Sequence, residues 1–392
     1  MSRALALAAR SDAPWYGTST ARLGTGWEPA VLVLLTVFLL LAGIITVYSA
    51  STVMAHQDGL PDHFFVLRQA SGAAGGFLLL VTMAFVDYRY LRLFAWPLLL
   101  LVIVALLITV LPGTYAIAPL RSGTRRWIDL GPVVLQTSEF AKLALIVWTA
   151  ALTVKKQDKL TSLSRGLLPF LCVWGVVLLL IFLQPNLSAA MLVLLLAALV
   201  VFAGGARIGH FILLAVVGMP LLWSQVGAAA YRIRRMAAFF DPTHDVVGMS
   251  YQINQALIAL GSGGVLGRGL GHGVQKFGYL PEPHNDFIFA MVGEEWGFAG
   301  TFLLILLYTA FALVGYRIAR HAPDLFGFLL AVGVTNLIVV QALLHICVNL
   351  ALVPTTGVTL PFVSYGRSSM LVCLAAVGIL INIARRTGEA RA

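Results

Sequence analysis

Long apolar runs recur along almost the whole chain, separated by shorter polar connections. The runs cover approximately residues 28–50, 65–86, 92–111, 137–154, 166–184, 187–204, 208–226, 286–316, 325–352 and 362–384. Each is close to or above the ~20 residues that a helix needs to cross a ~30 Å hydrocarbon layer. The pattern therefore predicts an all-α integral membrane protein of about ten transmembrane helices. We expect a tail at 1–26, a transmembrane domain at 27–386 and a second tail at 387–392.

The longest interruption of the apolar pattern, about 227–285, falls between the seventh and eighth predicted helices. Apolar residues at helical spacing from Ile253 to Leu260 predict one short amphipathic helix inside it. The aromatic and basic segment 231–240 looks interfacial. The glycine-rich segment 261–273 lacks the preceding strand and the Lys-Ser/Thr pair of a nucleotide-binding loop. It predicts tight turns that lay this long loop against the helices.

Lysine and arginine residues gather in the connections on one side of the predicted helices, including both chain ends and residues 155–165. Because such residues are enriched in cytoplasmic loops, both termini are predicted to be cytoplasmic. The net charge of +10 is then partly a topology signal and not a sign of nucleic-acid binding. Several cations nevertheless fall on the external side: Arg121, Arg125, Arg126, Arg232, Arg234, Arg235, Arg268 and Lys276. They either bind lipid headgroups without specificity or form a basic collar for an anionic lipid-linked substrate.

Ionisable side chains within apolar runs are costly and therefore candidates for function. Asp286 starts the eighth run, where it could serve as a general base or as a helix N-cap. Glu139 and Lys142 share a helix face, either as an intramembrane ion pair or as a substrate contact. Glu294 and Glu295 could be buried and hydrogen-bonded or part of a proton path.

A divalent cation, Mg²⁺ or Mn²⁺, is the one cofactor that the sequence suggests. His272, Glu282, His284 and Asp286 could together supply its ligands, since carboxylates suit hard cations. Their spacing matches no established metal motif, so the cation is a hypothesis and no other cofactor is predicted.

Four segments resemble the SEDS family of membrane glycosyltransferases, which includes FtsW, RodA and SpoVE. They are residues 123–131, with Arg125-Arg126-Trp127-Ile128, and then 138–142, 274–290 and 360–366. The matches span nearly the whole chain in order, and Val274-Gln275-Lys276 is more similar to the FtsW branch. Departures from the family pattern stand at Asn186, Gly278, Asn285 and Arg367.

The resemblance implies a ten-helix fold and polymerisation of lipid II, the undecaprenyl diphosphate-linked disaccharide-pentapeptide, at the outer face of the bacterial cytoplasmic (inner) membrane during cell division. It places the family's catalytic carboxylate at Asp286 and its essential arginine at Arg126. Substrate contacts are further expected at Glu139, Lys142, Lys276, His284 and Ser364. The expected partners are a class B penicillin-binding protein transpeptidase, other membrane proteins of the division septum, and membrane lipids.

Two other functions fit the same charged residues. A lipid-linked precursor flippase would also carry intramembrane carboxylates along its path. A non-catalytic scaffold that activates a partner transpeptidase would share the fold but would not need Asp286 or Arg126.

Overall fold

The computed structural model describes residues 26–389, except residues 122, 132, 228–229 and 241–248. Within these residues, seven helices are long and apolar enough to cross a membrane, and three shorter apolar helices accompany them. Each corresponds to one predicted run. They are α2 (Trp27–Gln57), α3 (Phe64–Phe85), α5 (Ala95–Val110), α6 (Thr137–Lys155), α7 (Leu168–Leu183), α8 (Leu187–Ala203), α9 (Ile208–Gly227), α12 (Ile288–His321), α13 (Leu325–Asn349) and α14 (Arg367–Glu389).

Smaller elements fill the connections. A short helix, α4 (Arg89–Leu93), precedes α5, and two single turns, η1 (Gln157–Lys159) and η2 (Leu163–Leu167), precede α7. Strands β1 (Trp127–Asp129) and β2 (Val134–Gln136) pair antiparallel, with Trp127 opposite Gln136. The sequence pattern did not predict this hairpin.

The interruption at 227–285 is not one irregular loop. It holds α10 (Ala230–Phe240) and α11 (Met249–Ser262), and α11 contains the predicted amphipathic segment. The predicted tail at 1–26 lies almost wholly outside the described residues. At the other end α14 continues to Glu389, three residues past the expected boundary at 386.

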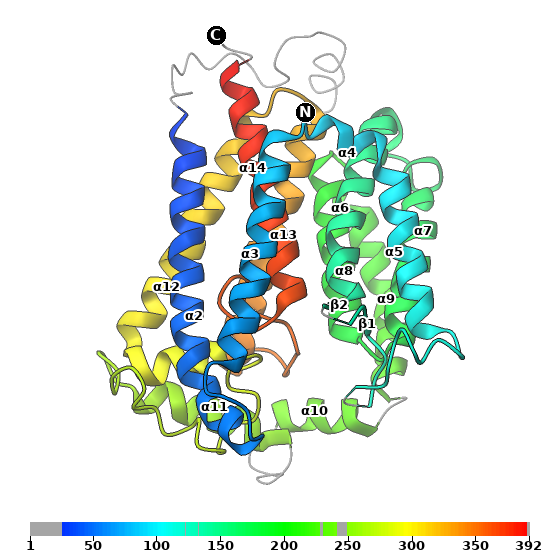
Figure 1. Ribbon diagram of the computed structural model, residues 1–392. Coiled ribbons are helices and arrows are strands. Elements are labelled where there is room, and N and C mark those ends of the chain that lie inside the picture. Colours follow the sequence, from blue (N-terminus) through cyan, green and yellow to red (C-terminus); the bar gives the residue numbers. More distant parts are fainter. Residues whose placement is uncertain (1–25, 122, 132, 228–229, 241–248, 390–392) are drawn as a thin grey trace.

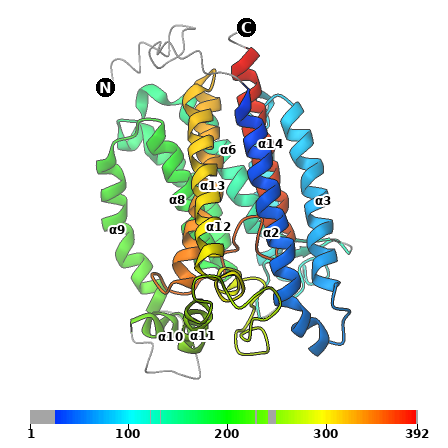
Figure 2. The ribbon, with the colours of Figure 1, turned by 90° about the vertical axis from the view of Figure 1, so that its left-hand side faces the viewer.

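The helices form one bundle whose two ends differ. Figure 1 shows the start of α2 and the end of α14 at the same end of the bundle, with α10 and α11 at the opposite end. This arrangement agrees with an even number of crossings. Figure 2 shows α9 at the edge of the bundle, where it runs down to α10.

The centre of the bundle is formed by α6, α13 and α14. In the most apolar 18 residues of these helices, 72%, 72% and 83% of the residues are buried, respectively. Helix α14 packs closely against α3 because glycine removes the side chain at the contact. A Cβ atom at Gly72 would lie 3.0 Å from Arg367, and one at Gly76 or Gly378 would collide with Leu374 or Leu80. Such small residues are how membrane helices bring their backbones together.

Candidate functional site

Asp286 lies in the turn immediately before α12. Phe287 occupies the N-cap position of that helix, which has no side-chain capping hydrogen bond, so the helix-cap interpretation of Asp286 is wrong. Asp286 is half-buried as a residue, and Gly357, which is exposed, lies beside its carboxylate. A Cβ atom at Gly357 would be 3.7 Å from Asp286 Oδ2. Residue 357 therefore places no side chain over the carboxylate.

The surroundings of Asp286 favour its protonated form. Its pKa is raised to about 7, chiefly by burial and also by the negative charge of Glu282, while the positive charge of Arg235 opposes this rise. A carboxylate with a pKa near neutrality can accept a proton from a hydroxyl and release it again at physiological pH. Asp286 thus has the protonation chemistry of a general base.

His284, two residues before Asp286, is held in an aromatic setting. Its ring centroid lies 4.9 Å from that of Phe65 and 5.3 Å from that of Tyr365. Burial lowers the pKa of His284 to about 4, so the ring is neutral at physiological pH. Its backbone carbonyl accepts a hydrogen bond from Tyr365 N at 3.0 Å. His284 therefore fixes the turn before Asp286, and a substrate contact stays a prediction.

Ser364 joins the same turn to the loop between α13 and α14. Its hydroxyl donates to Asn285 O at 2.8 Å and accepts from Leu360 N at 2.8 Å, while its carbonyl accepts from Gln69 Nε2 at 2.9 Å. The side chain is buried. The structure thus gives Ser364 a positioning role, and its predicted contact with substrate stays a prediction.

Glu139 and Lys142 form the expected ion pair inside the bundle. Lys142 Nζ lies 2.7 Å from Glu139 Oε2 and donates to Gln341 Oε1 of α13 at 2.6 Å. The amide nitrogen of Gln341 in turn donates to Thr359 O at 3.0 Å. The pair is therefore connected, through one side chain, to the loop that holds Gly357.

Arg126 ties the hairpin to the turn between α7 and α8. Its Nε donates to Gln184 O at 3.0 Å and its Nη2 to Pro185 O at 2.6 Å. These bonds fix the guanidinium beside the turn between α7 and α8. Its contact with a diphosphate stays a prediction.

Other cations of the predicted collar also have partners within the chain. Arg121 pairs with Asp129 at 2.6 Å, and Arg125 donates to Ala118 O at 2.9 Å. Arg234 on α10 is exposed. The side chain of Arg232 lies outside the described residues. Several of the predicted collar residues therefore make contacts within the chain, and whether the collar binds an anionic substrate or lipid headgroups stays a prediction.

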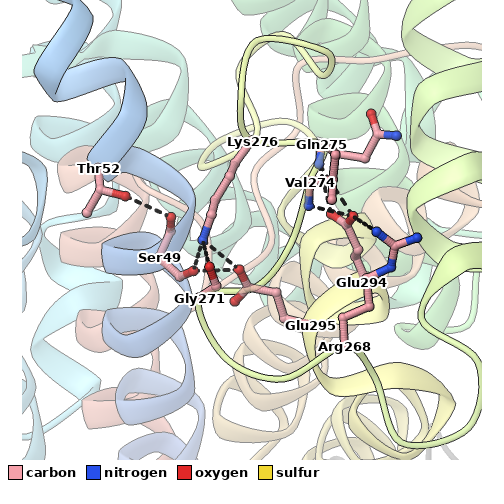
Figure 3. A network of polar contacts seen from close by, with 9 residues as sticks. All are labelled: Ser49, Thr52, Arg268, Gly271, Val274, Gln275, Lys276, Glu294 and Glu295. Carbon is pink, nitrogen blue, oxygen red and sulfur yellow. Dashed lines mark hydrogen bonds and ion pairs between the residues drawn. The ribbon is translucent and has the colours of Figure 1, made fainter.

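Lys276 is buried in a network with the carboxylates of α12 (Figure 3). Its Nζ lies 3.1 Å from Glu295 Oε1 and donates to Ser49 Oγ at 2.9 Å and Gly271 O at 2.8 Å. Glu294 accepts from Val274 N at 2.8 Å. The two glutamates are therefore buried and hydrogen-bonded, as one of the two interpretations proposed. Lys276 neutralises one of them, and this position does not support its predicted contact with substrate.

The glycine-rich segment lies against a break in α12. Gly297 has a left-handed backbone with φ of 68°, and around it Phe298 N and Ala299 N donate to Gly264 O and Val265 O at 2.9 and 3.0 Å. Gly269 N donates to Glu295 O at 3.0 Å. A Cβ atom at Gly267 or Gly297 would collide with the facing backbone. Close backbone approach thus explains these glycines, which agrees with the predicted tight turns.

The predicted cation ligands do not converge. In the described part of the chain, no group of three or more His, Cys, Asp or Glu side chains is arranged to hold a metal ion. His284 Nε2 and Glu282 Oε2 lie 3.9 Å apart. The described residues therefore do not fit the suggested cation site.

Sequence reasoning missed four residues around Asp286. Gly357 has no side chain to attract notice. Gln341, His345 and Asn349 lie on α13, and their amide or ring groups bond to the segments on either side of the carboxylate. Three polar residues at a spacing of four in an apolar helix were a readable signal, because that spacing places them on one face.

The chain is similar to known proteins over most of its length. A family model described as cell cycle protein, which covers FtsW, RodA and SpoVE, matches residues 30–389. Stage V sporulation protein E of Bacillus subtilis is 40% identical over 91% of this chain and 96% of its own. A probable peptidoglycan glycosyltransferase FtsW of Geobacter sulfurreducens is 40% identical over 91% of this chain and 95% of its own.

Solved structures agree with the fold. A chain in the structure titled "Structural coordination of polymerization and crosslinking by a peptidoglycan synthase complex" has a TM-score of 0.73 and 26% identity, over 91% of this chain and 97% of that one. The rod shape determining protein RodA of Thermus thermophilus has a TM-score of 0.65 and 27% identity, over 90% and 95%. The predicted resemblance is confirmed: the chain belongs to the FtsW/RodA/SpoVE family of membrane proteins.

Proposed function

We propose that this protein is a peptidoglycan glycosyltransferase that polymerises lipid II with Asp286 as its general base. One observation carries the proposal: the carboxylate of half-buried Asp286, with a pKa raised to about 7, lies beside a glycine. The relatives named peptidoglycan glycosyltransferases support the reaction class.

The reaction needs an acceptor hydroxyl made nucleophilic and a leaving diphosphate whose charge is neutralised. Asp286 takes the proton of the acceptor hydroxyl as its oxygen attacks the anomeric carbon of the donor. The bond from that carbon to the lipid diphosphate breaks, and the diphosphate leaves with the electron pair. Arg126 is the proposed cation for this negative charge, since a guanidinium can bind a phosphate through two parallel hydrogen bonds.

The cellular setting follows from the same proposal. The chain would lie in the bacterial cytoplasmic (inner) membrane with both termini in the cytoplasm, and Asp286 would face outward, where lipid II is used. A class B penicillin-binding protein is the proposed partner, because a structural neighbour belongs to a complex that coordinates polymerisation with crosslinking. A role at the division septum is part of the proposal, because the matching family model is described as cell cycle protein.

One assay separates this function from the flippase and scaffold alternatives. Purified protein is incubated with lipid II, alone and with the class B partner, and glycan strands and lipid translocation are scored separately. Strand formation supports the proposal. Translocation without strands would favour a flippase, and neither activity, with the partner's crosslinking stimulated, would favour a scaffold.

The position of Gly357 beside the carboxylate offers a direct structural test. Gly357→Leu should cover the carboxylate and lower the polymerisation rate by about 10-fold or more, because the acceptor must approach within hydrogen-bond distance. Gly175→Leu on α7 is a matched control, since that exposed glycine has no atom within 4 Å of its Cβ position. Equal rates for both variants would show that the reacting group does not approach beside Gly357.

A further inference from the structure

Three buried polar residues of α13 form a row that faces the candidate site. Gln341, His345 and Asn349 are 0%, 1% and 0% exposed. Because they are spaced four residues apart, they lie on one helix face, with about 6 Å along the helix axis between successive residues. Buried polar groups in a membrane helix need partners, so the identity of those partners is informative.

The partners are backbone groups on both sides of the Asp286 carboxylate. His345 Nδ1 bonds to Val358 O at 2.7 Å, next to Gly357. Asn349 Nδ2 donates to the carbonyl of Asp286 itself at 3.2 Å, and Asn349 Oδ1 accepts from Ala290 N in the first turn of α12 at 3.1 Å. One helix thus holds both the base and the loop that it faces.

Gln341 extends the row to the buried ion pair. Its Nε2 donates to Thr359 O at 3.0 Å and to Thr359 Oγ1 at 3.1 Å, and its Oε1 accepts from Lys142 Nζ at 2.6 Å. A shift of α13 would therefore move the loop, the carboxylate and the contact to Lys142 together.

We propose that Gln341, His345 and Asn349 are positioning residues for the reaction at Asp286. They set the separation between the Asp286 carboxylate and the 357–359 backbone, which is the space that an acceptor hydroxyl must enter. This inference rests on the proposed function and adds to it the residues that position Asp286 and the 357–359 loop. The three residues do not touch the substrate in this account, and they act through the backbone that they hold.

The bond of His345 fixes which ring nitrogen acts. A carbonyl only accepts hydrogen bonds, so Nδ1 carries the proton and Nε2 has a lone pair. Nε2 is buried and has no partner among the described residues. Asparagine places an amide at the δ position, whereas glutamine places one at the ε position. His345→Asn can therefore keep the bond to Val358, and His345→Gln cannot.

The test measures polymerisation of lipid II by the full-length protein in detergent or proteoliposomes, with kcat, KM and the pH profile for each variant. His345→Asn should stay within about 3-fold of wild type, and His345→Gln should lose about 10-fold or more in kcat with little change in KM, because small misplacements of reacting groups are costly. The acidic limb of the His345→Gln profile should also move to lower pH. A released loop would hydrate Asp286 and relieve the burial that raises its pKa.

Asn336 supplies the matched control. It is a buried amide of the same helix. Its hydrogen bonds go to Tyr316 and Val332, and not to the turn of Asp286 or to the 357–359 loop. Asn336→Ala should lower the melting temperature without moving the pH profile. Glu282 and Arg235, the charged groups that act on the pKa of Asp286, are unchanged in all these variants.

Gln341→Glu is a second test of the inference, and it does not require the His345→Gln variant to fold. It keeps an acceptor for Lys142 but loses the donor to Thr359, so kcat should fall by about 10-fold. Equal impairment of His345→Asn and His345→Gln, or a wild-type rate for Gln341→Glu, would overturn the inference while wild-type activity kept the proposed function. A wild-type protein that makes no strands would instead remove the proposed function.

Discussion

Removal of the Lys276 ammonium should destabilise the segment that leads to Asp286. Lys276 and Glu295 are 5% and 0% exposed at their side chains, with 3.1 Å between Nζ and Oε1. In Lys276→Met the apolar stem remains, but Glu295 keeps its charge and loses its cation. The variant therefore isolates the ion pair from the packing of the side chain.

The expected cost is large for a single substitution. At 3.1 Å and an effective dielectric constant of ~20, the Coulomb attraction is about 5 kcal/mol. Deletion of one partner of a buried pair costs about 3–5 kcal/mol, because an uncompensated charge stays behind. Lys276→Met/Glu295→Gln should recover most of this loss, since neither charge then remains and the amide can still accept from Ser49.

Unfolding by a denaturing detergent in mixed micelles measures these free energies. The control is Arg121→Met, which breaks an ion pair of 2.6 Å whose side chains are 44% and 26% exposed. Pairs of that kind contribute about 0–1 kcal/mol. Two results would contradict a role of the buried network in holding the glycine-rich segment. One is a loss of unfolding free energy in Lys276→Met no larger than that in Arg121→Met. The other is a Lys276→Met/Glu295→Gln variant that is less stable than Lys276→Met.

Three further predictions concern chemistry and orientation. Arg126→Ala should reduce polymerisation far more than Arg320→Ala at unchanged membrane levels. Arg126→Lys should recover only part of the polymerisation activity, since lysine lacks the two-pronged donor geometry of arginine. Equal losses in Arg126→Ala and Arg320→Ala would refute a special role for Arg126. The polymerisation rate should rise with pH through about 7 as Asp286 loses its proton, and a flat profile from pH 6 to 8 would contradict this. Because the folded-state pKa exceeds the ordinary value, the contribution of Asp286 to stability is full below about pH 4 and decreases as the pH rises through about 7. Cysteine at exposed Leu266 should react with an impermeant thiol reagent in intact spheroplasts and cysteine at Lys159 should not, with the reverse pattern refuting the orientation.

The apolar pattern predicted the helices well because the length of a membrane helix is set by the lipid and not by its neighbours. The expected run 137–154 is α6, and 187–204 is α8. The hairpin of β1 and β2 could not be predicted in this way. Its strands have three residues each, which is too short for a periodic signal.

The candidate site was predicted in its chemistry but not in its contacts. Asp286 and the Glu139–Lys142 pair are unusual residues in apolar surroundings, so their positions alone drew attention. Lys276 shows the limit of this approach, because a lysine in an external loop reads as a solvated charge until Glu295 is placed beside it. Gly357 and Asn349 gain their roles only from tertiary packing, which no local pattern encodes.

The central claim is that the Asp286 carboxylate accepts the proton of the acceptor hydroxyl. Asp286→Asn tests it most directly, because the amide has the same size, carries no charge and the residue caps no helix, so the melting temperature should not fall. We predict that lipid II polymerisation by the purified variant falls by about 100-fold or more. Asp286→Glu should restore little, since the extra methylene moves the carboxylate beyond the roughly 0.5 Å tolerance of a catalytic geometry. A folded Asp286→Asn protein that polymerises lipid II at the wild-type rate would contradict the claim.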